Sequence, residues 1–105
     1  MRRPVKRPEE AESHYRRSIA LKGNESKTHA DLAELLHHQG RREEAETEYR
    51  TALELDPANA IAIMNLGTLL RDTGRFSEAT ELYARAKDLP DLDEETRIKL
   101  DEMLA

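Results

Sequence analysis

The sequence contains no cysteine and no tryptophan, and it has only one phenylalanine among 105 residues. Without cysteine, a disulfide framework, a thiolate zinc site and a cysteine nucleophile are excluded. Glycine and proline are also scarce, with four of each, and aromatic residues make up 4% of the chain. Strands draw on aromatic and β-branched residues and are joined by frequent turn residues. This composition therefore favours helices over sheets.

The chain also lacks a long apolar run and an excess of positive charge. No apolar stretch follows the basic segment 1–8, so the sequence shows neither a secretory signal nor a membrane-spanning helix. Residues 9–105 hold 13 basic and 22 acidic side chains, which gives them a net charge of −9. An acidic body argues against a nucleic-acid surface. We therefore expect no nucleic-acid partner, no membrane contact and a cytoplasmic location, which the lack of cysteine also fits.

An alanine and a tyrosine four residues apart recur at intervals of 34 residues, which indicates an internal repeat. The three pairs are Ala11 and Tyr15, Ala45 and Tyr49, and Ala79 and Tyr83. Gly40 and Gly74 keep the same interval, and each ends a run of good helix formers, where a left-handed cap costs little for glycine. These glycines predict the turns between antiparallel helices.

The repeat predicts where the helices begin and end, and which of their faces form the core. We expect helices near 9–22, 27–39, 42–55, 60–73, 76–88 and 93–104, after a disordered basic arm at 1–8. Pro57 is expected in the first turn of a helix, where proline costs nothing. The leucines expected in the core are Leu32, Leu35, Leu36, Leu66, Leu69 and Leu70.

Together these positions resemble the signature of the tetratricopeptide repeat family. The residues that carry the resemblance are Leu66-Gly67, Gly74, Ala79, Tyr83 and Ala86, and in the preceding copy Leu32, Ala33, Gly40, Ala45, Tyr49, Ala52 and Pro57, with Ala33 in place of the usual glycine. The resemblance implies an all-α, right-handed superhelical solenoid of antiparallel helix pairs. Its units are a half repeat at 9–25, full repeats at 26–59 and 60–93, and a capping or half-repeat helix at 94–105. Because the first unit is a half repeat, we expect either a piece of a longer protein or a minimal array.

The resemblance also implies a concave groove lined by the first helix of each repeat. The groove residues that it assigns are Lys27, Ala30, Glu34, His37, Ile61, Met64, Asn65, Thr68 and Arg71. Ile61 and Met64 have no evident place in the core, and apolar side chains beside polar ones suit a peptide site. Asn65 lies next to them, and members of the family often use an asparagine here to bind a ligand's backbone. The alternative is that Ile61 and Met64 only pack on neighbouring repeats.

One specificity of the family is disfavoured by residue type. Its co-chaperone members hold the C-terminal carboxylate of heat-shock chaperones with lysine, asparagine and arginine side chains from three groove helices. The five corresponding places here are Ala30, Glu34, Asn65, Glu95 and Lys99. Two of them are glutamates, which would repel an anionic ligand.

Metal and catalytic sites find little support in the sequence. His37 and His38 are adjacent, so on a helix they point about 100° apart and do not converge on one ion. Several glutamates are expected on the solvated side of a helix, where nothing would perturb their pKa: Glu43, Glu44, Glu46 and Glu48. No phosphate-binding loop, nucleophile elbow or zinc-protease motif is present. We therefore predict no metal site, no cofactor and no enzymatic activity.

The sequence thus predicts a scaffold that binds a partner protein, as a peptide or a helix, in the concave groove. One alternative is a structural module that docks through its ends onto itself or onto further repeats. Another is the substrate-recruiting part of a larger, repeat-bearing enzyme. Tyr15, Ile19 and Leu21 are expected to leave part of an apolar stripe uncovered at the first helix, which would favour weak self-association.

Overall fold

A computed structural model describes residues 8–22 and 25–105, so segment 1–7 of the expected basic arm lies outside the described residues. The described residues form helices and no strands. The helices are α1 (Pro8–Lys22), α2 (Ser26–His38), α3 (Arg42–Leu55), α4 (Ala60–Asp72), α5 (Phe76–Lys87) and α6 (Glu94–Leu104). Each end lies within one residue of the position predicted from the repeat, and the all-α prediction is confirmed.

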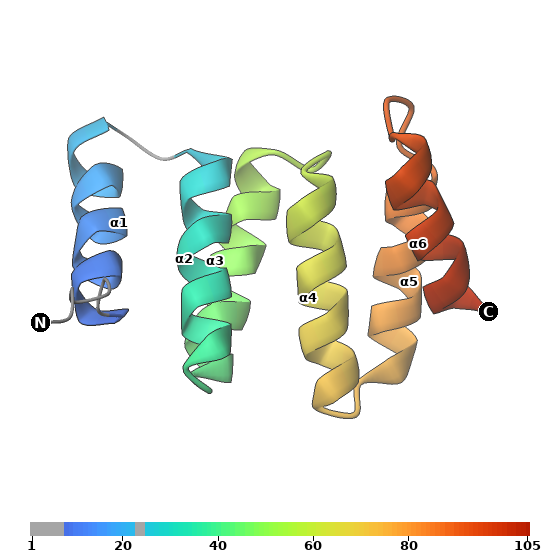
Figure 1. Cartoon of the computed structure of the whole chain (residues 1–105), viewed down its shortest axis with the longest axis horizontal. Helices are drawn as coiled ribbons and strands as arrows, with labels where there is room; N and C mark the ends of the chain where they lie inside the picture. The colour runs from blue at the N-terminus through green and yellow to red at the C-terminus, as the bar shows by residue number, and fades with distance from the viewer. Residues whose placement is uncertain (1–7, 23–24) are drawn as a thin grey trace, which may run out of the picture.

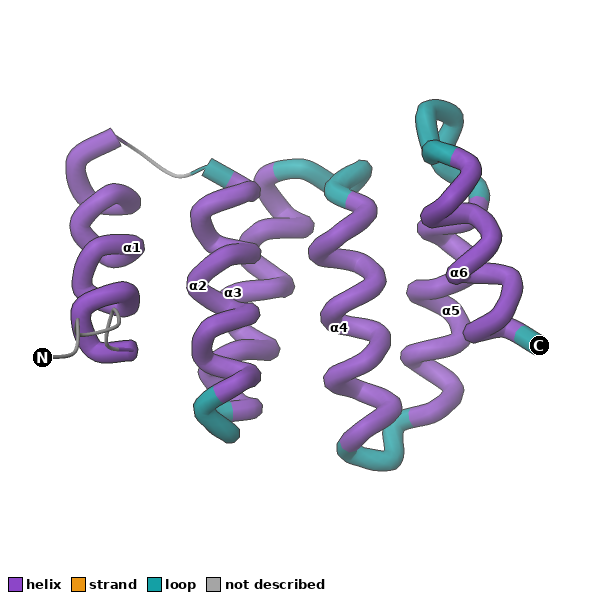
Figure 2. The backbone as a smooth tube through the Cα atoms, in the orientation of Figure 1, coloured by secondary structure: helices purple, strands orange, loops and turns teal. Residues whose placement is uncertain are grey.

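The helices stand in a row, and neighbours along the chain run in opposite directions (Figure 1). The closest pairs are α2 with α3 and α4 with α5, while α1 packs on α2, α3 on α4, and α5 on α6. Helices α2 and α4 also touch directly. The resulting body measures 46 × 30 × 26 Å, and its connections alternate between the two edges of the row (Figure 2). This is the layout of a short helical solenoid.

Both helix pairs turn at a glycine with a positive φ, as the sequence predicted. Gly40 has φ 81° and Gly74 has φ 85°, a backbone conformation that residues with a Cβ atom rarely adopt. In the first turn the amide of Arg41 donates to the carbonyl of Leu36 at 2.9 Å, and in the second the amide of Arg75 donates to the carbonyl of Leu70 at 2.8 Å. These bonds complete the same C-terminal cap twice, so the two pairs fold back in the same way.

The core follows the alanine and tyrosine stripe of the second helix in each pair. Tyr49 and Tyr83 are buried, and the alanines on either side of them let the first helices approach closely. The apolar residues at the centre of the core are Ala30, Leu32, Ala33, Leu36, Ala45, Tyr49, Ala52, Ala62, Ile63, Leu66, Leu69, Leu70, Ala79, Leu82, Tyr83, Ala86 and Leu100. One continuous cluster therefore joins α2 to α6, and burial of its apolar surface holds the row together.

Two local expectations are corrected. Pro57 lies in the turn between α3 and α4 rather than in a first helical turn, and Asn59 caps α4 by accepting the amide of Ala62 at 3.1 Å. The turn forms there because the Asp56 carboxylate accepts the amide of Ala58 at 3.0 Å. Leu35 is only half-buried, because its side of α2 faces α1 rather than the centre of the core.

At α1, the apolar stripe is covered in part. Tyr15 and Ile19 are half-buried and pack against the core cluster, whereas Leu21 is 77% exposed. The uncovered part of the stripe is therefore smaller than the sequence suggested. Self-association through this end stays a prediction.

The outer face carries ion pairs that the sequence analysis did not foresee. Arg41 joins Glu12 of α1 at 2.8 Å to Glu44 of α3 at 2.7 Å. Hydrogen bonds from Arg41 hold the pKa of both glutamates below the usual value. The expectation that nothing would perturb the Glu44 carboxylate is wrong, because it overlooked Arg41 at the N-cap of the same helix.

The same arrangement recurs 34 residues later. Arg75 binds Glu46 of α3 at 2.9 Å and Glu78 of α5 at 2.9 Å. At Glu46 burial raises the pKa, but hydrogen bonds from Arg75 and Arg50 outweigh burial and leave the pKa low. Each arginine thus connects the second helices of consecutive units, and we call these two clusters the arginine staples.

Candidate functional site

The first helices α2 and α4 and the last helix α6 lie next to one another on one side of the row. Near their N-termini, α2 and α4 are joined by the Asn59 amide, which donates to the Ser26 hydroxyl at 2.8 Å. The Ser26 hydroxyl in turn donates to the carbonyl of Ala52 at 2.7 Å. The helices α4 and α6 are separated by a cavity instead, and this cavity is the candidate site.

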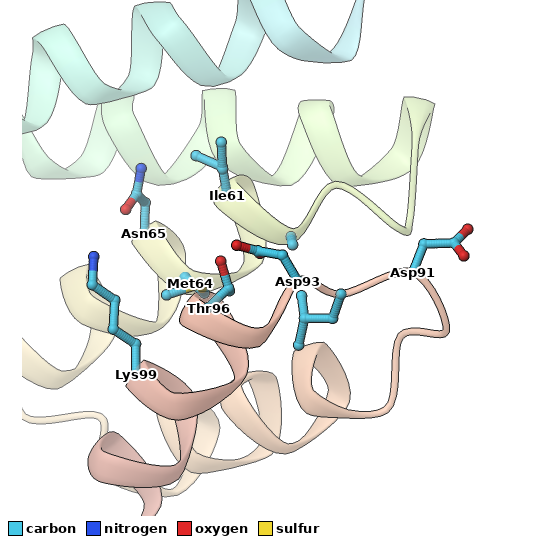
Figure 3. Close-up of a pocket in the computed structure, with 9 residues that line it drawn as sticks. Ile61, Met64, Asn65, Asp91, Asp93, Thr96 and Lys99 are labelled. Carbon is cyan, nitrogen blue, oxygen red and sulfur yellow. The ribbon is translucent and has the colours of Figure 1, made fainter.

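The cavity has a volume of about 400 Å³ and is open to solvent. It is lined by Ala60, Ile61, Met64, Asn65, Asp91, Leu92, Asp93, Thr96 and Lys99. Figure 3 shows Ile61 and Asn65 of α4 facing Asp93, Thr96 and Lys99 across it. The Lys99 amine lies on the side of Asn65, the Asp93 carboxylate lies toward the other end, and Asp91 points away (Figure 3). The site therefore has apolar, cationic and anionic parts.

The apolar part comes from the spacing of α4. Ile61 and Met64 are three residues apart and so share a helix face. Ile61 is 66% exposed, although an isoleucine in a helix is usually buried. Met64 is half-buried and packs against the core cluster. The expectation that neither residue has a place in the core therefore holds for Ile61 and not for Met64. The two side chains together offer an apolar contact surface, and the packing of Met64 on the core holds one side of it in place.

The structure brings only three of the nine predicted groove residues into this cavity, namely Ile61, Met64 and Asn65. On α2, Lys27 and Glu34 are exposed, and Lys27 pairs with Asp31 at 3.2 Å. Ala30 is 5% exposed and belongs to the core, so it offers almost no surface to a ligand.

The remaining predicted residues interact with their neighbours. His37 lies 3.8 Å from the Asp72 carboxylate, which links the C-terminal ends of α2 and α4. The Thr68 hydroxyl lies 3.0 Å from the Tyr83 hydroxyl, and the Arg71 guanidinium lies 6.0 Å from the centre of the Tyr83 ring. Thr68 and Arg71 therefore brace α4 against α5, and Arg71 is also exposed.

Beneath the groove, the Tyr49 phenol is buried between α2 and α4. Burial raises its pKa, the negative charge of Glu34 adds to this effect, and the neighbouring Asn65 amide lowers the pKa by less. The Tyr49 hydroxyl has no hydrogen-bond partner among the residues that the structure describes. The groove thus has a buried polar group below Glu34 and Asn65.

Sequence reasoning missed one wall of the cavity. Asp91, Leu92 and Asp93 belong to the connection between α5 and α6, and Thr96 lies in the first turn of α6. The sequence analysis assigned no binding role to this connection. The signal that could have found it is the 34-residue interval, which places Asp93 in the position of Asn59 and Lys99 in that of Asn65.

Two further searches concern the described residues only. Over 8–22 and 25–105, no group of three or more histidine, aspartate or glutamate side chains is placed to hold a metal ion. Within the same two ranges, no helix has both the length and the apolar character needed to cross a bilayer.

Comparisons with known proteins agree with this geometry. A family model described as tetratricopeptide repeat matches residues 30–94. No curated protein matches the sequence. Among solved structures, the chain is similar to the type III secretion translocator chaperone SycD of Yersinia enterocolitica, with a TM-score of 0.83 and 18% identity. The match covers 92% of this chain and 69% of the chaperone chain. At this identity the similarity concerns the fold.

Proposed function

Because this chain belongs to the tetratricopeptide repeat family, we propose that it binds a segment of a partner protein in the groove between its first helices. The repeats make the chain a protein–protein interaction module, and such solenoids bind through extended concave surfaces. The finer assignment, to the groove and to α4 in particular, is our proposal.

The observation that carries the proposal is Ile61. It is 66% exposed and stands at the mouth of a cavity of about 400 Å³, beside the half-buried Met64. An apolar side chain held in solvent at a concave surface gains free energy when a partner covers it. Methionine adapts its shape to varied partners, which suits a site that accepts a peptide side chain.

The rim of the groove favours a partner of mixed charge. Lys27 and Glu34 stand on α2, Arg71 on α4 and Lys99 on α6, and all four are exposed. Three of these four are cationic, but the exposed carboxylates of Asp91 and Asp93 also line the cavity, so the rim does not select a strongly acidic or strongly basic partner. Affinity is then expected to come from the apolar contact and orientation from the rim.

The solved neighbour is a type III secretion translocator chaperone. We extend to this chain only the general role of holding a partner protein. The identity of that partner is not implied by a similarity of fold.

The test begins with peptides selected from a random display library on the wild-type protein. Ile61→Glu should weaken binding of the selected peptides about tenfold or more, because a charge would replace the apolar contact. Since Ile61 is 66% exposed, this variant should keep its helical circular dichroism and its melting temperature. Met64→Arg is the second variant, and its thermal melt is measured first because Met64 also touches the core.

The matched control is Glu43→Lys with Glu54→Lys on α3, where both side chains are exposed and form no ion pair with any residue that the structure describes. This control should bind the selected peptides as the wild type does. Selected peptides that bind Ile61→Glu normally, or that lose affinity for the α3 control instead, would contradict the groove assignment. Failure to select any peptide would also count against it.

A further inference from the structure

Two equivalent junctions between first helices differ in their polar contacts. At the junction of α2 and α4, Asn59 both caps α4 and donates to the Ser26 hydroxyl at 2.8 Å. Thirty-four residues later, at the junction of α4 and α6, the corresponding residues are Asp93 and Ala60. Alanine has no hydroxyl, and a carboxylate cannot donate a hydrogen bond. The bridge that closes the first junction therefore cannot form at the second.

The Asp93 carboxylate is left without the interactions of its counterpart. It occupies the N-cap position of α6, yet it makes no capping hydrogen bond, and it forms no ion pair with any residue in the described part of the chain. Aspartate normally caps a helix by accepting an amide of the first turn. Here the carboxylate extends instead toward Ile61 across the cavity (Figure 3). It is an acceptor that a ligand can use.

The other end of the cavity offers a donor. The Lys99 amine lies on the side of Asn65, whose carbonyl oxygen faces it while the amide nitrogen points away (Figure 3), and Lys99 forms no ion pair with a described residue. Asp93 and Lys99 are six positions apart on α6, which corresponds to about 9 Å along a helix axis. In an extended peptide, side chains two and four residues apart share a face, and a four-residue step spans about 13 Å between Cα atoms, which long charged side chains can shorten. Ile61 and Met64 line the same cavity as the two charges.

We propose that this cavity recognises an extended partner segment by the order of its charged side chains. The segment carries a lysine or arginine and, four residues away, an aspartate or glutamate, with an apolar side chain midway, so that all three share one face of the extended chain. The cation binds Asp93, the apolar side chain covers Ile61 and Met64, and the acid binds Lys99. This inference rests on the proposed function and adds to it the chemistry of the partner.

The charges also fix the direction in which the segment lies across α6. A segment in which the two charges are exchanged has two options. It can bind with its chain direction reversed, or it can keep its direction and place its cation beside Lys99 and its acid beside Asp93. Like charges brought together at a binding site disfavour the complex strongly. Peptides with both orders of the two charges therefore distinguish the chain direction.

The experiment uses blocked serine and threonine peptides with a central leucine, and with lysine and glutamate two residues to either side of it, in either order. Binding is followed by fluorescence anisotropy. One of the two orders should bind about tenfold more tightly than peptides in which serine replaces the lysine or the glutamate, because each charge makes a charge-assisted contact. Serine in place of leucine should cause the largest loss. Raising the salt concentration should weaken the preferred peptide most.

Substitutions in the protein test the two proposed charge contacts separately. Asp93→Asn should bind the preferred peptide about tenfold more weakly, and it should no longer distinguish lysine from serine. Asparagine is a favourable N-cap residue and no capping bond is lost, so the melting temperature should not change. Lys99→Gln should likewise lose the preference for glutamate. Asp91→Asn removes the same charge two residues away, where the side chain points out of the cavity (Figure 3), and should have little effect.

The outcomes separate this inference from the proposed function. If leucine peptides bind, and Ile61→Glu prevents it, but neither charge matters, then the charge pattern is wrong and the groove assignment stands. Equal losses for Asp91→Asn and Asp93→Asn would also overturn the pattern. If the designed peptides fail while display-selected peptides respond to Ile61→Glu, this inference alone falls. If neither set depends on Ile61, the proposed function falls as well.

Discussion

The helix pairs α2–α3 and α4–α5 occupy equivalent places 34 residues apart, yet they bury their tyrosines differently. The Tyr83 hydroxyl lies 3.0 Å from the Thr68 hydroxyl of its own pair. The corresponding Tyr49 faces Glu34 instead, and its hydroxyl finds no hydrogen-bond partner among the described residues. The repeat thus sets the backbone and the apolar stripe. The polar contacts depend on single positions outside the repeated signature.

A second difference lies one position earlier in the first helix of each pair. Ala33 is fully buried in α2, and its counterpart in α4 is Gly67. A Cβ on Gly67 would lie 2.6 Å from the Tyr83 ring. Glycine at this place therefore allows Tyr83 to come within reach of Thr68. The pair without this glycine is also the pair whose tyrosine hydroxyl forms no hydrogen bond with a described residue.

The largest expected effect is at this position. Gly67→Ala should destabilise the protein by about 1–3 kcal/mol, because the new methyl displaces a buried ring and overpacks the core. This cost exceeds the gain of about 1 kcal/mol that alanine brings to a helix. Ala33→Gly, the reverse change in the other pair, should cost about 1 kcal/mol through helix propensity and about 0.8 kcal/mol more through the loss of a buried methyl group. Urea unfolding measures both, and a stabilised Gly67→Ala would show that Tyr83 does not pack closely on α4.

The tyrosines themselves should give a smaller contrast. Tyr83→Phe should cost about 0.5–1.5 kcal/mol, because the hydroxyl contact with Thr68 is lost. Tyr49→Phe should be neutral or slightly stabilising, because the change removes a buried hydroxyl that has no described partner. The two variants are compared by urea unfolding under the same conditions. Equal losses would show that Tyr49 does make a hydrogen bond in solution, with Asn65 as the nearest candidate.

Much of the fold was predictable from the sequence because its signals are local and repeated. Gly40 and Gly74 marked the turns, and the recurring alanine and tyrosine pairs marked the second helices. Each of these signals depends on residues three or four positions apart on a single helix. Such spacings determine which face is apolar before any tertiary contact forms.

The remaining features depend on how one helix crosses another. Glu46 pairs with Arg75, and Glu48 lies 2.7 Å from His29, although both glutamates were expected on a solvated face. Asp93 entered the candidate site because the connection before α6 brings it opposite Ile61. No spacing within one helix contains this information. The groove residues assigned from the sequence stay a prediction until binding is measured.

The smallest expected effect concerns the arginine staples, which are the polar feature that the two pairs share. Hydrogen bonds from arginine keep the pKa of Glu12 and Glu46 below the usual value of 4.5, and at Glu46 they do so against the effect of burial. A carboxyl with a lowered pKa in the folded state binds fewer protons than in the unfolded state. Its contribution to stability is therefore present above the usual pKa and is lost as the pH falls through the lower, folded value.

Glu12→Gln and Glu46→Gln should each lower the free energy of unfolding slightly at neutral pH, and they should make it fall less steeply below pH 4.5. The loss is small because ion pairs at a solvated surface contribute little. Glu43→Gln is the control, since Glu43 is exposed and pairs with no residue that the structure describes. Urea unfolding across the acid range, at low and high salt, measures all three. If Glu43→Gln reduces the acid dependence as much as Glu12→Gln and Glu46→Gln do, general charge repulsion rather than the staples governs acid stability, and the two pairs share only their apolar stripe.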